Sequence, residues 1–194
     1  MAFIEPVMLS GRHVRLEPLA MSHHDDLVQA ASDGELWTLW YTSVPAPQAM
    51  RAWIETALAM RPQHALPFVI RDARDDSIVG STRYFNVDPS NRRLEIGHTW
   101  HAKRAQRTGI NTETKLLLLG HAFEALQCIA VEFRTHWMNH PSREAIARLG
   151  AKQDGVLRQH QRMADGSLRD TVVFSIIDAE WPAVKRHLQY KLER

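Results

Sequence analysis

Residues 94–126 of this chain read LEIGHTWHAKRAQRTGINTETKLLLLGHAFEAL, and this stretch decides the fold. Its first residues, 94–100, predict a strand, a basic turn follows, and a helix is expected from about Thr112 to Leu126. The first N–H groups of a helix have no partner within it, and the helix dipole favours negative charge there. A strand that opens through such a turn into a helix is therefore a candidate phosphate site.

Two interpretations of this turn are open. In the first, Arg104 and Arg107 supply positive charge for a phosphate group, and Gly109 lets the backbone approach it closely or take a conformation that other residues avoid. In the second, the stretch is an ordinary strand, turn and helix with solvated arginines. The turn alone does not separate the two.

Length and composition indicate one globular domain over residues 1–194, with 44% hydrophobic and 24% charged residues. A net charge of only +2 argues against nucleic acid as a partner. The single cysteine, Cys128, allows no internal disulfide and favours a reducing compartment. Because no apolar run reaches the ~20 residues that span a bilayer and no signal-peptide pattern is present, we expect a cytoplasmic protein with no membrane partner.

Hydrophobic periodicity gives the order of the elements. Strands are expected over residues 12–18, 68–70, 78–85, 94–100, 129–137, 157–163 and 171–177, and helices over 22–31, from 47, over 112–126, from 141 and from 178. Asp165-Gly166 is typical of a hairpin turn between the last two strands. Helices and strands mixed in this way predict an α/β (α+β) domain around a central, partly antiparallel sheet.

Two short motifs lie in this order of elements. The first, Gln106 to Asn111, fits the pattern Gln/Arg-x-x-Gly-x-Gly/Ala at Gln106 and Gly109 and departs from it at Asn111. The second is Asn139-x-x-Ser142, followed by Leu149-Gly150. With these motifs in these places, the chain resembles the GNAT superfamily of acyl-CoA-dependent N-acetyltransferases, and in particular its RimJ/RimL branch, which acetylates ribosomal-protein N-termini.

The resemblance implies a three-layer fold with a mixed, mostly antiparallel sheet of about six to seven strands flanked by helices. It also implies a reaction in which an amine attacks the acetyl group of acetyl-CoA directly, within a ternary complex. The acceptor would be a protein N-terminus, an amino acid or another small amine. Coenzyme A serves as co-substrate, no metal is needed, and family habit favours a homodimer.

For coenzyme A, the resemblance implies contacts from the turn, the start of the helix and the second motif. Amides from Arg107 to Thr112 would hold the pyrophosphate, and Asn139 the pantetheine arm. A backbone donor for the thioester oxygen would come from the strand where it splays from its neighbour, near Ile96–Trp100, and Gly97 there fits a bulge. The full set is Trp100, Arg104, Gln106, Arg107, Thr108, Gly109, Ile110, Asn111, Thr112, Asn139 and Ser142.

Glu95 is the candidate general base, because the family often places a glutamate on this strand. The alternative is a solvated strand glutamate paired with Arg92 or Arg93. Many members have an acidic tyrosine seven residues after the asparagine, where this chain has Ile146, so Ser142 becomes the nearest hydroxyl candidate for the acid. Ser142 equally fits a helix-start hydroxyl that bonds the local backbone.

Aromatic residues between the first two helices suggest an acceptor pocket. Trp40 and Tyr41 are expected in its wall, with Tyr84 and Asn86 as further acceptor-side residues, whereas Trp37 is expected in the core. The eleven histidines lack the spacing of a structural zinc site or a metalloprotease, so no metal is expected. Cys128 enters an apolar strand and fits a buried structural thiol.

Two other classes of function are compatible with these residues. A coenzyme A-binding sensor without turnover is motivated by the missing tyrosine at Ile146. A binder of nucleic acid or phosphoprotein would use Lys103, Arg104 and Arg107, but the low net charge argues against it.

Overall fold

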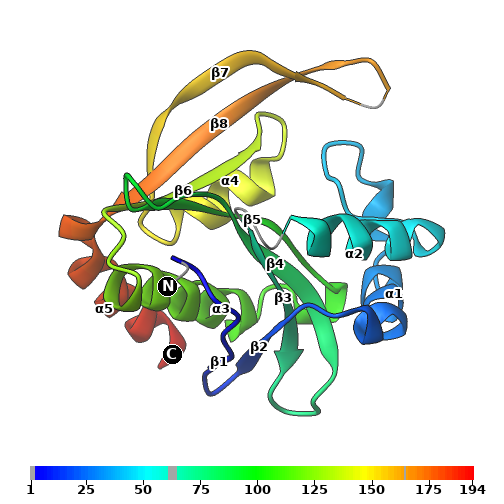
Figure 1. The fold of residues 1–194 in the computed structure, drawn as a ribbon, viewed down its shortest axis with the longest axis horizontal. Coiled ribbons are helices and arrows are strands. Elements are labelled where there is room, and N and C mark those ends of the chain that lie inside the picture. Colours follow the sequence, from blue (N-terminus) through cyan, green and yellow to red (C-terminus); the bar gives the residue numbers. More distant parts are fainter. Residues whose placement is uncertain (1–2, 61–64, 164) are drawn as a thin grey trace.

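The computed structural model describes residues 3–60, 65–163 and 165–194. In these residues eight strands form one mixed sheet, in the order β1-β2-β3-β4-β5-β6-β8-β7 (Figure 1). The strands are β1 (Leu9–Ser10), β2 (Val14–Pro18), β3 (Leu66–Asp72), β4 (Ile78–Asp88), β5 (Arg93–His101), β6 (Ala130–His136), β7 (Lys152–Arg162) and β8 (Leu168–Ile177). Every neighbouring pair is antiparallel except β5 and β6. The expected mixed, mostly antiparallel sheet is confirmed, and the strand beyond the expected number is the two-residue β1.

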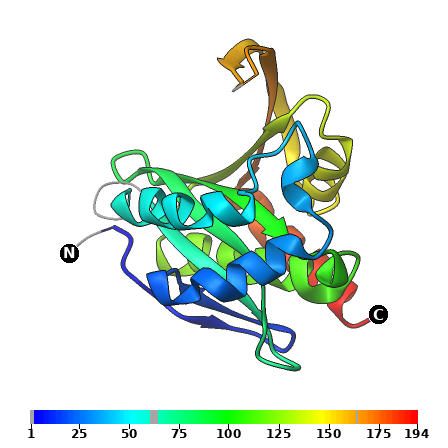
Figure 2. The same ribbon diagram turned by 90° about the vertical axis from the view of Figure 1, so that its right-hand side faces the viewer.

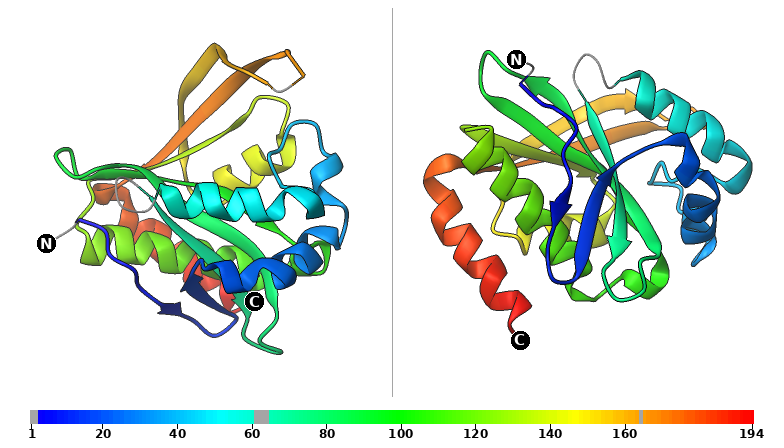
Figure 3. Two further views of the ribbon diagram at one scale, coloured as in Figure 1. Left: turned by 45° about the vertical axis from the view of Figure 1, so that its right-hand side comes forward. Right: turned by 60° about the horizontal axis from the view of Figure 1, so that its bottom comes forward.

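Helices cover both faces of the sheet. They are α1 (His24–Ser32), α2 (Met50–Ala59), α3 (Gly109–Gly120), α4 (His140–Ala147) and α5 (Trp181–Leu192). Figure 2 shows α1 and α2 in front of one face, and the right panel of Figure 3 shows α3 and α5 side by side against the other. No helix in the described ranges is long and apolar enough to cross a membrane.

Each helical layer closes its own core. One cluster of buried side chains joins the sheet to α3 and α5 and includes Phe68, Tyr84 and Phe133. The other joins the sheet to α1 and α2 and includes Val69 and Trp100. Because successive strand residues face opposite sides, Phe68 and Val69 belong to different clusters. The three-layer arrangement follows from this alternation.

The helix expected from Thr112 begins at Gly109. Thr108 caps it, because its Oγ1 accepts a hydrogen bond from the N–H of Ile110 at 3.3 Å. The left-handed residue of the turn is Arg107, with φ of 59°, rather than Gly109. The unpaired N–H groups of the first turn therefore begin three residues earlier than expected.

The parallel pairing of β5 with β6 is short. It joins Arg93 to Ala130, Leu94 to Val131 and Glu95 to Glu132, and no further pair between β5 and β6 follows in the described residues. Beyond Glu95 the two strands diverge, so that one edge of β5 has backbone groups without a strand partner. This is the splay expected near Ile96–Trp100.

A bulge follows directly on β5. Between the pairs Arg83–Gly97 and Ser81–Trp100, two residues of β5 oppose one residue of β4. The expected bulge near Gly97 is confirmed, but the left-handed residue is His98, with φ of 49°. Gly97 itself lies against the ring of Phe85, where a side chain would clash.

One buried carboxylate fixes the N-terminal strands to α3. Glu113 Oε1 accepts from the N–H of Arg12 at 2.9 Å, and its Oε2 accepts from those of His13 at 2.5 Å and Val14 at 2.8 Å. The side chain is 6% exposed. Hydrogen bonds to charged groups are among the stronger ones, so this carboxylate holds the start of β2 beside the first turns of α3.

Glu113→Ala leaves three backbone donors without an acceptor, and we expect the free energy of unfolding to fall by about 2–4 kcal/mol. Urea denaturation followed by circular dichroism measures this. Glu193→Ala, which removes an exposed carboxylate near the C-terminus, is the matched control. Equal unfolding midpoints for the two variants would contradict the anchoring role.

Candidate active site

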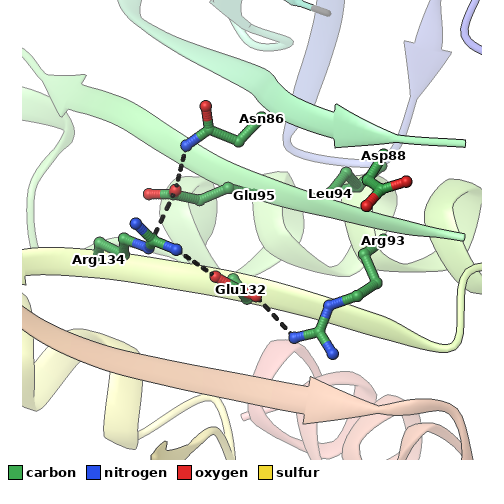
Figure 4. A pocket seen from close by; sticks show the side chains of 7 residues that line it. All are labelled: Asn86, Asp88, Arg93, Leu94, Glu95, Glu132 and Arg134. Atoms are coloured by element: carbon green, nitrogen blue, oxygen red, sulfur yellow. Dashed lines mark hydrogen bonds and ion pairs between the residues drawn. The ribbon is translucent and has the colours of Figure 1, made fainter. Parts of the chain in front are cut away.

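Glu95 is the last residue of β5 that pairs with β6, and it lies on the face opposite to Leu94 and Ile96. It is 3% exposed. A cavity of about 330 Å³ opens beside it. Seven residues from β4, β5 and β6 line this cavity: Asn86, Asp88, Arg93, Leu94, Glu95, Glu132 and Arg134 (Figure 4).

A chain of polar contacts holds Glu95. Asn86 Nδ2 donates to Glu95 Oε2 at 2.9 Å, and Arg134 Nε lies 3.4 Å from the same oxygen. Arg134 also donates to Glu132 at 2.9 Å, and Glu132 accepts from Arg93 at 2.6 Å. Figure 4 shows these four links in a row. The partner of Glu95 is therefore Arg134.

The solvated pairing of Glu95 with Arg92 or Arg93 is wrong. Arg93 is bound to Glu132, and Arg92 donates to the carbonyl groups of Leu126 and Gln127. Glu95 is instead buried, and burial changes the pKa of its carboxyl group.

Burial raises the pKa of Glu95 to about 7, against the lowering effects of the Asn86 hydrogen bond and the Arg134 charge. The pKa of His98, whose ring packs against Phe85, is shifted the other way. Desolvation of the ring, with the charges of Arg83 and Arg169, lowers this pKa to about 4, although the residue as a whole is exposed. At neutral pH the carboxyl is therefore poised to exchange a proton, while the imidazole is neutral.

A second bulge brings Asn86 to Glu95. Between the pairs Phe85–Glu95 and Asp88–Arg93, two residues of β4 oppose one of β5, and Asn86 takes a left-handed φ of 46°. Bulges re-aim side chains in this way. The sequence placed Asn86 on the acceptor side, and in the structure its amide faces the candidate base.

Tyr84 does not belong to this face, and its assignment to the acceptor side needs correction. It is fully buried in the core beside α3, where its hydroxyl donates to the carbonyl of Leu118 at 2.6 Å. Strand alternation explains the difference, because Tyr84 faces α3 and the next residue, Phe85, faces Gly97 on the Glu95 side.

Trp40 lies over the same face as Glu95. Its ring contacts Tyr41, with centroids 5.6 Å apart, and His136 at 5.1 Å. His136 follows Glu132 and Arg134 at two-residue steps along β6, so all three share a face. Trp40 is 58% exposed and available to a ligand, whereas Trp37 packs against the core of α1 and α2, as expected.

The basic turn is less free than its sequence suggested. Arg104 donates its backbone N–H and its guanidinium to Asp33 Oδ2, at 3.0 and 3.3 Å, and reaches Ser77 Oγ at 3.3 Å. These contacts tie the turn to other loops, and the expected contact of Arg104 with a phosphate stays a prediction. Arg107 is exposed, and its guanidinium makes no ion pair with the residues that the structure describes.

Two more of the expected coenzyme A contacts have internal partners. Gln106 Nε2 donates to the carbonyl of His101 at 3.0 Å. The indole of Trp100 is 7% exposed and packs edge-on against Trp53, with centroids 6.4 Å apart. Its side chain is a core residue, so only its backbone faces the gap beside β5.

The second motif forms the start of α4. Asn139 is the N-cap, and its Oδ1 accepts from the N–H of Ser142 at 3.1 Å. The amide nitrogen of Asn139 and the hydroxyl of Ser142 are left for other partners. Ile146 lies in the core. Cys128 is buried too, and burial raises the pKa of its thiol to about 11, which disfavours the nucleophilic thiolate.

No group of three or more histidine, cysteine, aspartate or glutamate residues in the described ranges could hold a metal ion. The cavity beside Glu95 thus combines a perturbed carboxyl with charged neighbours. The N–H groups of Gly109 and Asn111 have no carbonyl partner within α3. The cavity therefore suits proton transfer, and the start of α3 suits the binding of an anion.

Comparison with known proteins agrees with this geometry. A family model described as "Acetyltransferase (GNAT) domain" matches residues 13–152. The chain belongs to the GNAT acetyltransferase family. A GCN5-related N-acetyltransferase from Brucella melitensis is 32% identical to this GNAT chain, with a TM-score of 0.90 over 98% of this chain and 87% of that one.

Two further proteins resemble this GNAT chain. YdaF of Bacillus subtilis (strain 168), provisionally named a ribosomal N-acetyltransferase, is 32% identical over 111 residues, which are 57% of this chain and 60% of YdaF. Mycobacterium smegmatis RimJ, solved in complex with CoA-disulfide, is 24% identical and has a TM-score of 0.80 over 96% of this chain and 95% of that one. The latter shows likeness of fold alone.

Sequence reasoning missed the residues that surround Glu95 in this GNAT domain. Glu132 and Arg134 were part of the polar face of a strand and had no assigned role. The available signal was opposite charges at two-residue spacing on the strand expected over residues 129–137. It could not say which residue of β6 stands opposite Glu95.

The raised pKa of Glu95 has a consequence for stability. Because folding raises it from 4.5 to about 7, the ionised carboxylate costs stability as pH rises through this window. Glu95→Gln removes that cost, so its stability relative to wild type should improve by about 2–3 kcal/mol between pH 5 and pH 8. Urea unfolding at both pH values measures it, with Glu193→Gln as control. A difference that does not change with pH would show that Glu95 ionises normally.

Proposed function

We propose that this protein transfers the acetyl group of acetyl-CoA to an amine, with Glu95 as the general base. One observation carries the proposal. Within the fold of an acetyltransferase family, the short parallel pairing of β5 with β6 ends at a buried carboxyl whose pKa is raised to about 7. A base is most effective when its pKa lies near the working pH.

The start of α3 suits the diphosphate of coenzyme A. Its free N–H groups and its dipole favour an anion, and the exposed Arg107 adds charge beside them. The expected coenzyme A contacts from Thr108 to Thr112 follow one another along this helix start, although the N–H of Ile110 is bound to Thr108. Asn139 and Ser142 remain the proposed contacts at α4, and the unpaired edge of β5 offers backbone groups to the pantetheine arm.

The reaction needs a neutral amine. Glu95, directly or through water, accepts a proton from the ammonium form or from the attacking nitrogen. The nitrogen bonds to the acetyl carbon, the carbon–sulfur bond breaks, and the sulfur leaves as a thiolate that takes up a proton. A thiol has a reference pKa of about 8.5, so the departing thiolate needs little help from an acid, and Ser142 is the nearest proposed donor.

A base with a pKa near 7 favours an α-amine as acceptor. An α-amine has a pKa of roughly 7.7–8.0 and a lysine amine about 10.4, so the proton moves to Glu95 far more easily from the former. Asp88 and Glu132 in the cavity would attract a cationic amine, and Trp40 would contact its other part. YdaF is provisionally named a ribosomal N-acetyltransferase, which is compatible with a protein amine as the acceptor. Cytoplasmic location and a homodimer stay predictions.

A coenzyme A sensor without turnover remains the second candidate, because Ile146 replaces the tyrosine of many relatives. Release of free thiol from acetyl-CoA, measured over a panel of peptides and small amines, separates the two. Thiol release that depends on an amine supports the transferase. Tight binding of coenzyme A, with no transfer to any α-amine, would support the sensor.

Glu95→Gln keeps the shape of the side chain but cannot accept the proton. We expect kcat/KM to fall by roughly 10²–10⁴-fold. The part of the low-pH decline that is due to protonation of Glu95 below about pH 7 should disappear, which leaves only the ionisation of the amine itself. Stopped-assay rates from pH 5.5 to 9 measure both effects, with Glu193→Gln as the control. Wild-type rates in the Gln variant at every pH would remove Glu95 from the mechanism.

A further inference from the structure

Lys115 is a buried cation that the proposed mechanism does not use. It lies on α3 and is 5% exposed. Its Nζ donates one hydrogen bond, to Thr99 Oγ1 at 2.8 Å. An ammonium group has three N–H donors, so two remain without a partner among the described residues.

No carboxylate in the described part of the chain lies within 4.0 Å of Nζ, so the charge has no ion-pair partner. The groups around it are neutral. Thr99 and His101 face it from β5, Thr82 stands 2.8 Å behind the Thr99 hydroxyl on β4, and the Phe133 ring centroid on β6 is 5.9 Å away. Burial and the charge of Lys115 lower the pKa of His101 to about 3, so its imidazole is neutral.

An unpaired buried ammonium is unfavourable, and burial lowers the pKa of Lys115 to about 7. An apolar side chain of similar length would fill this place at lower cost. The two unused donors and the missing counter-charge together indicate a polar group that is supplied from outside the chain.

The position of Nζ shows where such a group would enter. Thr99 and Phe133 are its contacts on β5 and β6, and both lie beyond Glu95 and Glu132, the last pair of these strands. The ammonium therefore lies beneath the gap between the diverging strands. It is six residues, or ~9 Å, along α3 from Gly109, where the helix begins.

We propose that Lys115 donates a hydrogen bond to a carbonyl oxygen of the pantetheine arm of coenzyme A, and that binding is accompanied by proton uptake at Lys115. This rests on the proposed function, which puts the diphosphate at the start of α3 and the arm in the gap. The arm carries amide carbonyls, and the acetylated form adds a thioester carbonyl. Each is an acceptor for a donor that has no other partner.

The sign of the proton linkage follows from the hydrogen bond. An acceptor favours the charged form of the lysine, so binding raises its pKa above the value of about 7 in the free protein. At pH 8 most of the free protein carries a neutral Lys115, so binding is accompanied by net proton uptake, of one proton at most. At pH 6 the lysine is already charged, and the uptake is small.

Isothermal titration calorimetry with coenzyme A, in buffers of different ionisation enthalpy, measures affinity and proton uptake together. Lys115→Met keeps the length and apolar stem but removes the donors, and Lys191→Met on α5 is the matched control. We expect coenzyme A to bind roughly tenfold to hundredfold more weakly to Lys115→Met, without the proton uptake seen for wild type at pH 8. Lys191→Met should match wild type.

Thermal unfolding separates this role from a purely structural one. Because Lys115→Met removes an unpaired buried charge, its Tm should equal or exceed that of wild type while its affinity falls. Unchanged affinity and unchanged proton uptake in Lys115→Met would overturn the proposal. An acetyl group on Lys115 in the mass spectrum would also overturn it, because the lysine would then be an acyl acceptor.

Wild-type protein gives an independent measurement. With ¹³C-labelled lysine, the Lys115 Cε signal should titrate near pH 7, apart from the other lysines, and move to higher pH when coenzyme A is bound. A midpoint that coenzyme A leaves in place contradicts the hydrogen bond. Failure of wild type to bind coenzyme A at all would instead refute the proposed function on which this inference rests.

Discussion

The brief parallel contact between β5 and β6 is the constraint on which the rest of the structure depends. Three residue pairs join the strands, and the last of them is Glu95 with Glu132. Had the pairing continued, the edge of β5 would be saturated by β6 and Lys115 would lie under a closed sheet. The divergence instead leaves backbone groups, a buried carboxyl and a buried ammonium around one gap, with Glu95 on one face and Lys115 on the other.

Two bulges shape the backbone on either side of Glu95. One stands on β4 at Asn86 and the other on β5 at His98, so they flank Glu95 on the two strands of one hairpin. Each uses a left-handed residue other than glycine, a conformation that costs energy and therefore needs support from its surroundings. Here the support is visible, because Asn86 is bound to Glu95 and His98 packs against Phe85 at 4.9 Å.

Much of the fold could be predicted from the sequence. Alternation located β5 and β6, and Asp165-Gly166 marked the turn of the final hairpin, where Gly166 has a φ of 84°. The start of α3 was misplaced because Thr108 was not recognised as its cap. The start of β7, at Lys152 rather than Leu157, was missed because the side chains of its first residues are exposed. A strand without a buried face gives no periodic signal.

The site was harder to predict, because its properties arise between elements. The resemblance pointed to Glu95, but its polar partners, Arg134 and Asn86, stand on two other strands. Arg104 was expected to be free because Asp33, its partner, is 71 residues away in sequence. Lys115 is the last of several polar residues before a run of leucines, and only packing shows that its side chain faces the gap rather than solvent.

The bond between Glu113 and the residues before β2 sets an order of events during synthesis. The N–H groups of residues 12–14 find their acceptor about one hundred positions later. A growing polypeptide must therefore extend past the first turns of α3 before its leading edge can dock. Until α3 has been synthesised, the N–H groups of residues 12–14 lack their acceptor, so this region assembles in a late, long-range step.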